Sequence, residues 1–237
     1  MLQIIKVTKS YDGVKKACNE VDLSIEAGDL YGFIGHNGAG KTTLLKSIAG
    51  IISFDEGDIL VDGFSIISNP LDVKNRIAYI PDQPNVYESL TGMQYLDFIA
   101  DVFKVEKELR RQRIHEYVQL FELEEALNQP IASYSHGMKQ KIVIISALIH
   151  QPKLFLLDEP FVGLDPKASY NLKQVFQKMR EKGTAIFFST HVLEVAEKLC
   201  NKVAIIKQGK IVAHGETKDV IKDSSLESIF MEIANEA

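Results

Sequence analysis

The most informative stretch of the chain is Gly35-His36-Asn37-Gly38-Ala39-Gly40-Lys41-Thr42-Thr43. An apolar run at 30–34 precedes it, and a helix-like segment at 41–49 follows it. Strand, glycine-rich loop and helix are the context in which the pattern G-x-x-x-x-G-K-[ST] binds phosphate. A glycine-rich turn without a ligand is the alternative, but it does not account for the Lys-Thr ending. The stretch therefore predicts a site for a nucleoside triphosphate.

The backbone and the side chains of this loop are expected to bind different parts of the ligand. Glycines permit backbone angles and close approaches that a Cβ would block. The loop N–H groups and the helix N-terminus then face one anion. Lys41 adds a positive charge for the outer phosphates, and Thr42 offers a hydroxyl to Mg²⁺. The nucleotide-binding residues predicted in the loop are Gly35, His36, Asn37, Gly38, Ala39, Gly40, Lys41, Thr42 and Thr43.

Composition limits the class of protein. A length of 237 residues suits one large domain or two small lobes, and 46% apolar residues suffice for a core. The net charge of −5, without a block of Lys or Arg, argues against a nucleic-acid partner. Cys18 and Cys200 form no CxxC and are typical of buried thiols in a reducing compartment. No signal peptide is recognised, and the longest apolar run, 142–149, is far shorter than the roughly 20 residues that span a bilayer. We expect a soluble, cytoplasmic chain that must dock to another protein if it works at a membrane.

Two carboxylates follow a second buried strand. The apolar run 154–157 delivers Asp158 and Glu159 at its end. In open α/β sheets ligands lie outside the carboxyl ends of the strands, and paired carboxylates there are costly without a cation. We expect Asp158 to hold Mg²⁺, directly or through water, and Glu159 to act as the base for an attacking water. A solvated strand end is the alternative.

The remaining pattern predicts an α/β fold. Strands at 2–7 and 17–25 suggest an antiparallel flap beside a parallel core, and the pattern from 91 to 126 suggests a helical insertion, roughly 84–150. Tyr11 lies just ahead of the second strand, either as a half-buried strand-end tyrosine or as an aromatic platform for a purine. His191 follows a buried strand at 184–188, and its imidazole could reach a terminal phosphate there. Further strands are expected at 57–62, 77–80, 203–207 and 210–213, and helices at 166–180 and 225–235.

A third motif, Ser135-His136-Gly137-Met138, opens a helical run that ends near Ile149. It resembles the signature motif, LSGGQ, of the ATP-binding subunits of ABC transporters. The spacing of loop, signature, Asp158-Glu159 and His191 also resembles that family over the whole chain. The resemblance implies a RecA-like P-loop core with an antiparallel β flap and an inserted helical lobe. The implied boundaries of this single domain, 1–237, are core and flap 1–83 and 151–223, helical lobe 84–150 and helical tail 224–237.

The resemblance also implies roles for single residues. Tyr11 would stack on adenine, Glu159 would be the catalytic base and His191 the switch histidine. Ser135 and Gly137 would contact the γ-phosphate of ATP held by a second subunit. The implied Walker A loop, Walker B strand and interface-crossing loop are Gly35–Thr42, Leu154–Asp158 and Gly163–Asp165.

The chain departs from the family pattern at three places. His136 replaces the first signature glycine, at a cost of roughly 1–2 kcal/mol if that position needs a positive φ. Met138 replaces the usual glutamine. The resulting pattern, Ser-x-Gly-Met, resembles the signature of the ATPases of bacitracin and peptide exporters. The family has a glutamine that approaches Mg²⁺. The matching position in this chain is Asp82, and the only nearby glutamine is its neighbour Gln83. Either residue could fill this metal role.

The function implied by the resemblance is an ATPase subunit that binds MgATP and powers a separate membrane permease. The permease would export antibiotic, peptide or lipid-like substrates, and the chain would lie at the inner face of the cell membrane. It would pair with a second ATPase subunit, as a homodimer or a heterodimer. ABC ATPases of DNA repair or translation carry long coiled-coil insertions or two cassettes, which this sequence lacks. A P-loop GTPase is disfavoured because 201–204 lacks the Asp of NKxD, and a P-loop kinase is disfavoured because Glu159 after the Mg²⁺ Asp favours hydrolysis over transfer to a substrate.

Overall fold

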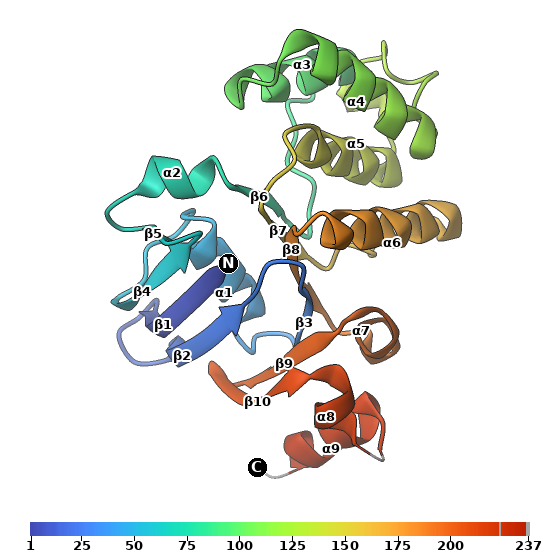
Figure 1. The fold of residues 1–237 in the computed structure, drawn as a ribbon. Helices are drawn as coiled ribbons and strands as arrows, with labels where there is room; N and C mark the ends of the chain where they lie inside the picture. The colour runs from blue at the N-terminus through green and yellow to red at the C-terminus, as the bar shows by residue number, and fades with distance from the viewer. Residues whose placement is uncertain (223, 236–237) are drawn as a thin grey trace. The chain divides into compact units, whose positions relative to one another are not determined.

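The computed structural model describes residues 1–222 and 224–235, so residue 223 and the last two residues of the predicted tail lie outside the described residues. The chain forms two compact units (Figure 1). The first comprises 1–79, 153–160 and the described part of 176–237. The second comprises 80–152 and 161–175, so it includes a segment beyond the predicted helical insertion. Helix α6 (Pro166–Glu181) runs from the second unit into the first.

Within its described residues the first unit holds two sheets. The antiparallel sheet has the order β2-β1-β4-β5. The mixed sheet has the order β10-β9-β3-β8-β7-β6. In it β3 runs parallel to β8 and β9, and β7 runs parallel to β8. The strands are β1 (Leu2–Ser10), β2 (Lys16–Ile25), β3 (Leu30–Ile34), β4 (Glu56–Val61), β5 (Phe64–Ser65), β6 (Ile77–Ile80), β7 (Leu154–Asp158), β8 (Ala185–Thr190), β9 (Lys202–Lys207) and β10 (Lys210–Glu216).

The central strands of the mixed sheet are continuous buried runs. Every residue of β3, β7 and β8 is buried. Such runs are typical of parallel strands covered on both faces. Strand β8 extends through Ser189 and Thr190, which were predicted to follow the strand. They belong to it because Ser189 pairs with Asp158 and Phe33, and Thr190 pairs with Ile34.

The helices of the first unit are short. Three of them, α2, α7 and α8, have no counterpart among the sequence predictions. The set is α1 (Lys41–Ile48), α2 (Pro70–Lys74), α7 (Leu193–Leu199), α8 (Thr217–Ile221) and α9 (Leu226–Asn235).

The second unit is helical. Its elements are α3 (Gly92–Val102), α4 (Lys107–Leu120), the short 3-10 helix η1 (Ile131–Ser133) and α5 (His136–Ile149). Thr91 and Gln94 form a capping box at the start of α3, and the Glu106 carboxylate caps α4. The predicted helical pattern from 91 to 126 breaks between α3 and α4, where Lys104 has a φ of 54°. Residues 142–149 of α5 are all buried, and α5 packs against α3 and α4. Within the described residues, no helix has the length and apolar character needed to cross a membrane.

Candidate functional site

The phosphate loop joins the end of β3 to the start of α1, in the first unit. Gly40 has a φ of 113°, and a Cβ there would lie 2.1 Å from the carbonyl oxygen of Ala17. A Cβ on Gly35 would lie 2.7 Å from the carbonyl oxygen of Ile206. Both positions require glycine because the loop packs directly on the backbones of β2 and β9. The loop is therefore held by the two sheets before any ligand contacts it.

Lys41 is the first residue of α1, and its side chain turns back toward the loop. Its Nζ donates hydrogen bonds to the carbonyl oxygens of Gly35 (2.6 Å) and His36 (3.3 Å). Burial lowers the pKa of Lys41, while the nearby carboxylates of Glu159 and Asp158 oppose this shift. The loop thus holds a buried ammonium group whose donors lie beside the loop carbonyls.

Asp158 ends β7 and is 2% exposed. The Thr42 hydroxyl donates to its Oδ2 at 2.6 Å, and the Ser189 hydroxyl donates to its Oδ1. A buried carboxylate beside a hydroxyl is a set of hard oxygen donors, the ligand type that Mg²⁺ prefers. Two of the residues that the sequence predicts for the metal, Thr42 and Asp158, therefore lie in direct contact and fit the ion.

Glu159 and His191 form a pair next to Asp158. The His191 Nδ1 lies 2.9 Å from the Glu159 Oε1, and the His191 N–H donates to the Glu159 Oε2 at 3.4 Å. Glu159 has a φ of 51°, an uncommon backbone conformation for a residue with a side chain. Its N–H donates to the Ser189 hydroxyl at 3.1 Å. The Glu159 side chain is mostly buried, whereas His191 is exposed, so the pair can present a carboxylate oriented by an imidazole.

Ser189 is a site residue that sequence analysis missed. Its hydroxyl contacts both Asp158 and the backbone of Glu159, and its side chain is fully buried. A polar residue at the end of an apolar strand was the available signal. The signal was insufficient because only the pairing of β7 with β8 places it beside the carboxylates.

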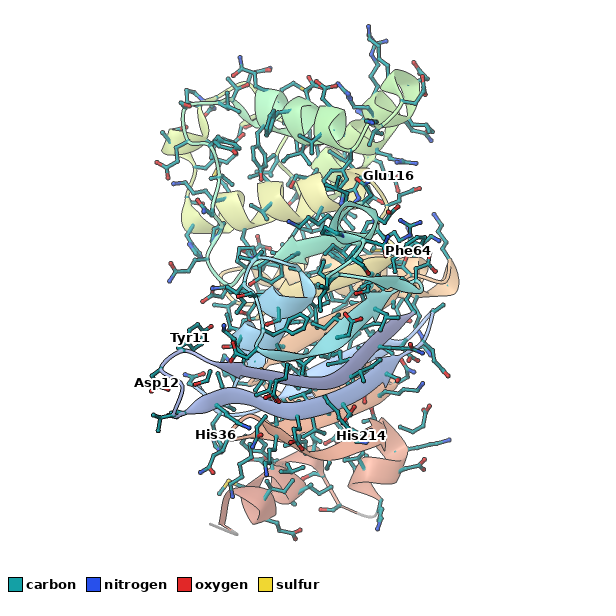
Figure 2. The ribbon with its side chains drawn as sticks, turned by 90° about the vertical axis from the view of Figure 1, so that its left-hand side faces the viewer. Tyr11, Asp12, His36, Phe64, Glu116 and His214 are labelled. Atoms are coloured by element: carbon teal, nitrogen blue, oxygen red, sulfur yellow. The ribbon has the colours of Figure 1, made fainter. Side chains whose placement is uncertain are left out.

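Tyr11 lies on the loop between β1 and β2 and is 68% exposed (Figure 2). Its hydroxyl and that of Thr43 are 3.3 Å apart. The same loop is held by the Asp12 carboxylate, which accepts hydrogen bonds from the N–H groups of Val14 and Lys15. These backbone hydrogen bonds lower the pKa of Asp12. The structure therefore brings an exposed aromatic ring to the start of α1, beside the phosphate loop.

The other predicted site residues belong to the second unit. The Ser135 hydroxyl caps α5 by accepting from the Met138 N–H at 3.3 Å. A Cβ on Gly137 would lie 3.0 Å from the carbonyl oxygen of Gly163. His136 begins α5 and has no positive φ, so the strain considered for a non-glycine residue at this place is absent. Asp82 and Gln83 are both exposed, and the Asp82 carboxylate accepts from the Gln83 N–H at 2.9 Å.

The predicted residues therefore fall into two sets, one in each compact unit. The first unit brings together the phosphate loop, Tyr11, Asp158, Glu159 and His191. The second unit holds Asp82, Gln83, Ser135 and Gly137.

Comparison with known proteins decides the family. The model of the ABC transporter family matches residues 18–162. The chain belongs to the ABC transporter family. It is 33% identical over 221 residues to the ABC-type transporter ATP-binding protein EcsA of Bacillus subtilis, covering 91% of this chain and 90% of that protein. It is 32% identical over 220 residues to the linearmycin resistance ATP-binding protein LnrL of the same organism, covering 93% and 70%. A longer uncharacterized ABC transporter ATP-binding protein of Nostoc is 36% identical over 211 residues, covering 87% of this chain and 61% of that protein.

Solved ABC structures share the fold. An ATP-binding subunit of an ABC transporter aligns with a TM-score of 0.95 and 31% identity, covering 99% of this chain and 100% of that one. The ATP-binding cassette MJ0796, in a dimeric post-hydrolysis state bound to ADP and Pi, aligns with a TM-score of 0.83 and 25% identity, covering 92% and 99%. The predicted ABC family and α/β fold class are confirmed. The chain is thus an ABC ATPase, an ATP-binding subunit of the kind that works with a membrane component.

Proposed function

We propose that this ABC subunit binds MgATP at the phosphate loop and hydrolyses it with Glu159 as the base. The observation that carries the proposal is the contact of Thr42 with Asp158 beside the Glu159–His191 pair. Lys41 and the loop N–H groups bind the phosphates, and Tyr11 stacks on the adenine. Thr42 and Asp158 hold Mg²⁺, which neutralises phosphate charge when bound.

The geometry of the Glu159–His191 pair indicates which group accepts the proton. The Glu159 carboxylate accepts a proton from the attacking water. The His191 imidazole and N–H hold both oxygens of that carboxylate, and this fixes the direction in which the base faces. His191 is exposed, so it can also contact the terminal phosphate. Asp158 does not take the proton in this scheme because the hydroxyls of Thr42 and Ser189 already bind its oxygens.

The test replaces the base without changing its size. Glu159→Gln should retain ATP binding and lower the rate of phosphate release by about 100-fold or more. His191→Ala, which leaves the carboxylate in place, is the matched comparison. A Glu159→Gln variant with normal phosphate release would show that another group is the base.

We propose further that two subunits complete the site. The Ser135 hydroxyl and Gly137 lie at the N-terminus of α5, which offers backbone donors to an anion. The family member MJ0796 forms a dimer, which supports binding of these residues to the γ-phosphate on a second copy. The chain then acts as one ABC domain with a core, a helical lobe and a C-terminal helical tail.

The dimer can be tested by light scattering. In Glu159→Gln, ATP should trap a dimer and ADP should not. Addition of Ser135→Arg should abolish that dimer and leave ATP binding in place. Chains that never pair even under trapping conditions would point to a heterodimer.

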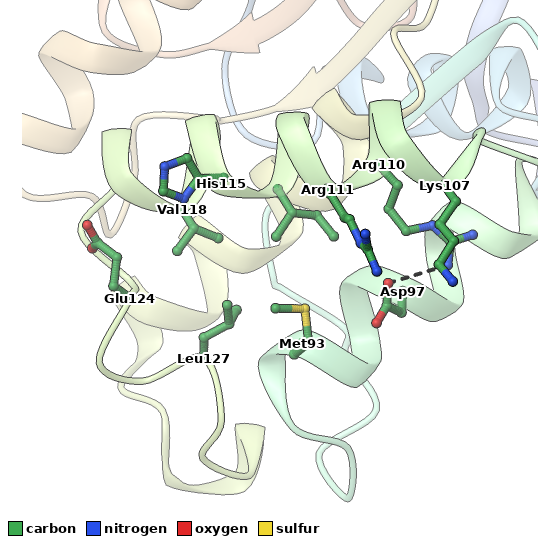
Figure 3. A pocket seen from close by; sticks show the side chains of 10 residues that line it. Met93, Asp97, Lys107, Arg110, Arg111, His115, Val118, Glu124 and Leu127 are labelled. Carbon is green, nitrogen blue, oxygen red and sulfur yellow. Dashed lines mark hydrogen bonds and ion pairs between the residues drawn. The ribbon is translucent and has the colours of Figure 1, made fainter.

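We propose a docking surface for the membrane permease in the second unit. A pocket of about 650 Å³ lies between α3 and α4 (Figure 3). Its apolar lining comes from Met93, Ile114, Val118 and Leu127. Lys107 and Arg111 add positive charge, whereas the guanidinium of Arg110 is already paired with Asp97 and Asp101.

The pocket fits a cytoplasmic segment of the permease that carries apolar side chains and an acidic residue. The apolar lining would bury the former, and Lys107 and Arg111 would attract the latter. Lys107→Glu with Arg111→Glu should reduce co-purification of a membrane permease that co-purifies with the wild-type chain, whereas Lys104→Glu, an exposed change outside the pocket lining, should not. If both variants recover equal amounts of the permease, the pocket is not part of the interface.

The transported substrate is proposed from the kind of relative. LnrL is named for linearmycin resistance, which supports an exporter of antibiotic, peptide or lipid-like molecules. The chain would then lie at the inner face of the membrane, held there by the permease. Substrate accumulation in cells with and without the permease gene tests the direction of transport.

A further inference from the structure

The last helix of the chain contacts the phosphate loop. In α9, Phe230 places its ring 4.4 Å, centroid to centroid, from the imidazole of His36 at an interplanar angle of 44°. His36 is the second residue of the loop, and both residues belong to the first unit. No sequence motif links them, and the contact joins two segments of the unit that are far apart in the sequence.

Helix α9 is held at both of its ends, so the position of Phe230 is defined. Leu226 is fully buried, and its N–H donates to the Glu197 carboxylate at 2.8 Å. Near the other end, the Lys207 Nζ donates to the carbonyl oxygen of Ile233 at 2.6 Å. The less exposed residues 226, 229, 230 and 233 recur at helical spacing and form the inward face. Met231 lies on the outward face and is 53% exposed.

The backbone of His36 is joined to the residue that binds phosphate. Its carbonyl oxygen accepts hydrogen bonds from the Lys41 Nζ at 3.3 Å and from the Ala39 N–H at 3.1 Å. The ring of His36 therefore meets α9, while its carbonyl orients Lys41 and the turn of the loop. The packing of the ring on α9 restricts the position of His36, and the same residue supplies the carbonyl that accepts from Lys41.

We infer that Phe230 is a positioning residue of the nucleotide site, which acts on the phosphate loop through His36. The inference rests on the proposed function of that loop. The interaction between two aromatic rings, in addition to the area that they bury, is worth a factor of about two to twelve in an equilibrium constant. The expected effect of removing the Phe230 ring is thus a several-fold weaker affinity for ATP, with the catalytic groups Glu159 and His191 unaffected.

A double-mutant cycle tests the coupling. ATP affinity is measured for wild type, Phe230→Leu, His36→Ala and the double variant, because leucine keeps α9 anchored by an apolar side chain but has no ring. Phe230→Leu should weaken ATP binding roughly two- to twelve-fold and raise KM with kcat nearly unchanged. In the His36→Ala background the same change should have an effect of less than about twofold. Met231→Leu, on the outward face of the same helix, is the control and should match wild type.

A second readout does not depend on nucleotide. The ring-current contribution of Phe230 to the NMR signal of His36 should disappear in Phe230→Leu and persist in Met231→Leu. If Phe230→Leu unfolds, Phe230→Tyr keeps the ring and should retain ATP affinity. Equal weakening by Phe230→Leu in both backgrounds, an unchanged affinity, or loss of affinity in Phe230→Tyr overturns the inference. Failure of wild type to bind ATP is a different outcome and overturns the proposed function itself.

Discussion

Ser189 offers a sharp test of how the buried carboxylate is supported. Ser189→Ala removes a hydroxyl that donates to Asp158 and accepts from the Glu159 N–H. Hydrogen bonds to charged groups contribute about 1.5–3 kcal/mol, and Ser189 is fully buried, so water does not replace the lost donor. We expect the free energy of unfolding to fall by about 1.5–3 kcal/mol. Hydrolysis should also slow because Asp158 and Glu159 lose the hydroxyl to which both are hydrogen-bonded.

Ser47→Ala is the matched control for this prediction. Ser47 is also a fully buried serine, but its hydroxyl donates at 2.9 Å to the neutral carbonyl oxygen of Thr43. Removal of this hydroxyl should lower the free energy of unfolding by about 0.5–1.5 kcal/mol. Urea unfolding measures both variants, and an unchanged slope shows that the same surface is exposed in each. If Ser189→Ala costs no more than Ser47→Ala, the hydroxyl does not support a charged carboxylate and the reasoning is wrong.

Three further predictions concern the nucleotide and the second unit. Lys41→Ala should abolish most binding of a fluorescent ATP analogue without unfolding the chain, because Lys41 is the only charged side chain in the loop; normal affinity would contradict this. Tyr11→Ala should weaken ATP and GTP to similar extents in competition binding, because stacking distinguishes bases weakly, whereas loss of one nucleotide alone would show base-specific contacts. Burial lowers the pKa of His150, stacked on Phe103, from 6.5 to about 4. The folded state then binds fewer protons than the unfolded state between these values, so stability should fall as pH drops from about 6.5 toward 4. His150→Gln should flatten that fall in urea unfolding measured at several pH values, and an unchanged pH dependence would count against it.

The sequence alone determined much of the first unit. The run 30–34, the glycine loop and the start of α1 predict their own conformation because each signal is local. Gly40, for example, has the positive φ that a glycine in such a loop permits. The apolar run before Asp158 likewise predicted a buried strand, and β7 has every residue buried. Neighbouring residues are sufficient to predict these features.

Tertiary structure decided which side chains meet. Thr42 contacts Asp158, and Glu159 contacts His191, because β3, β8 and β7 lie side by side in parallel and end at one edge of the sheet. The same pairing makes Ser189 part of the site, although its local sequence indicates only the end of a strand. The contact of Phe230 with His36 has no sequence signal at all, since it depends on how Glu197 and Lys207 anchor α9. Local patterns specify backbone conformation and burial, whereas contacts between distant segments follow from strand order and packing, which no single stretch of sequence contains.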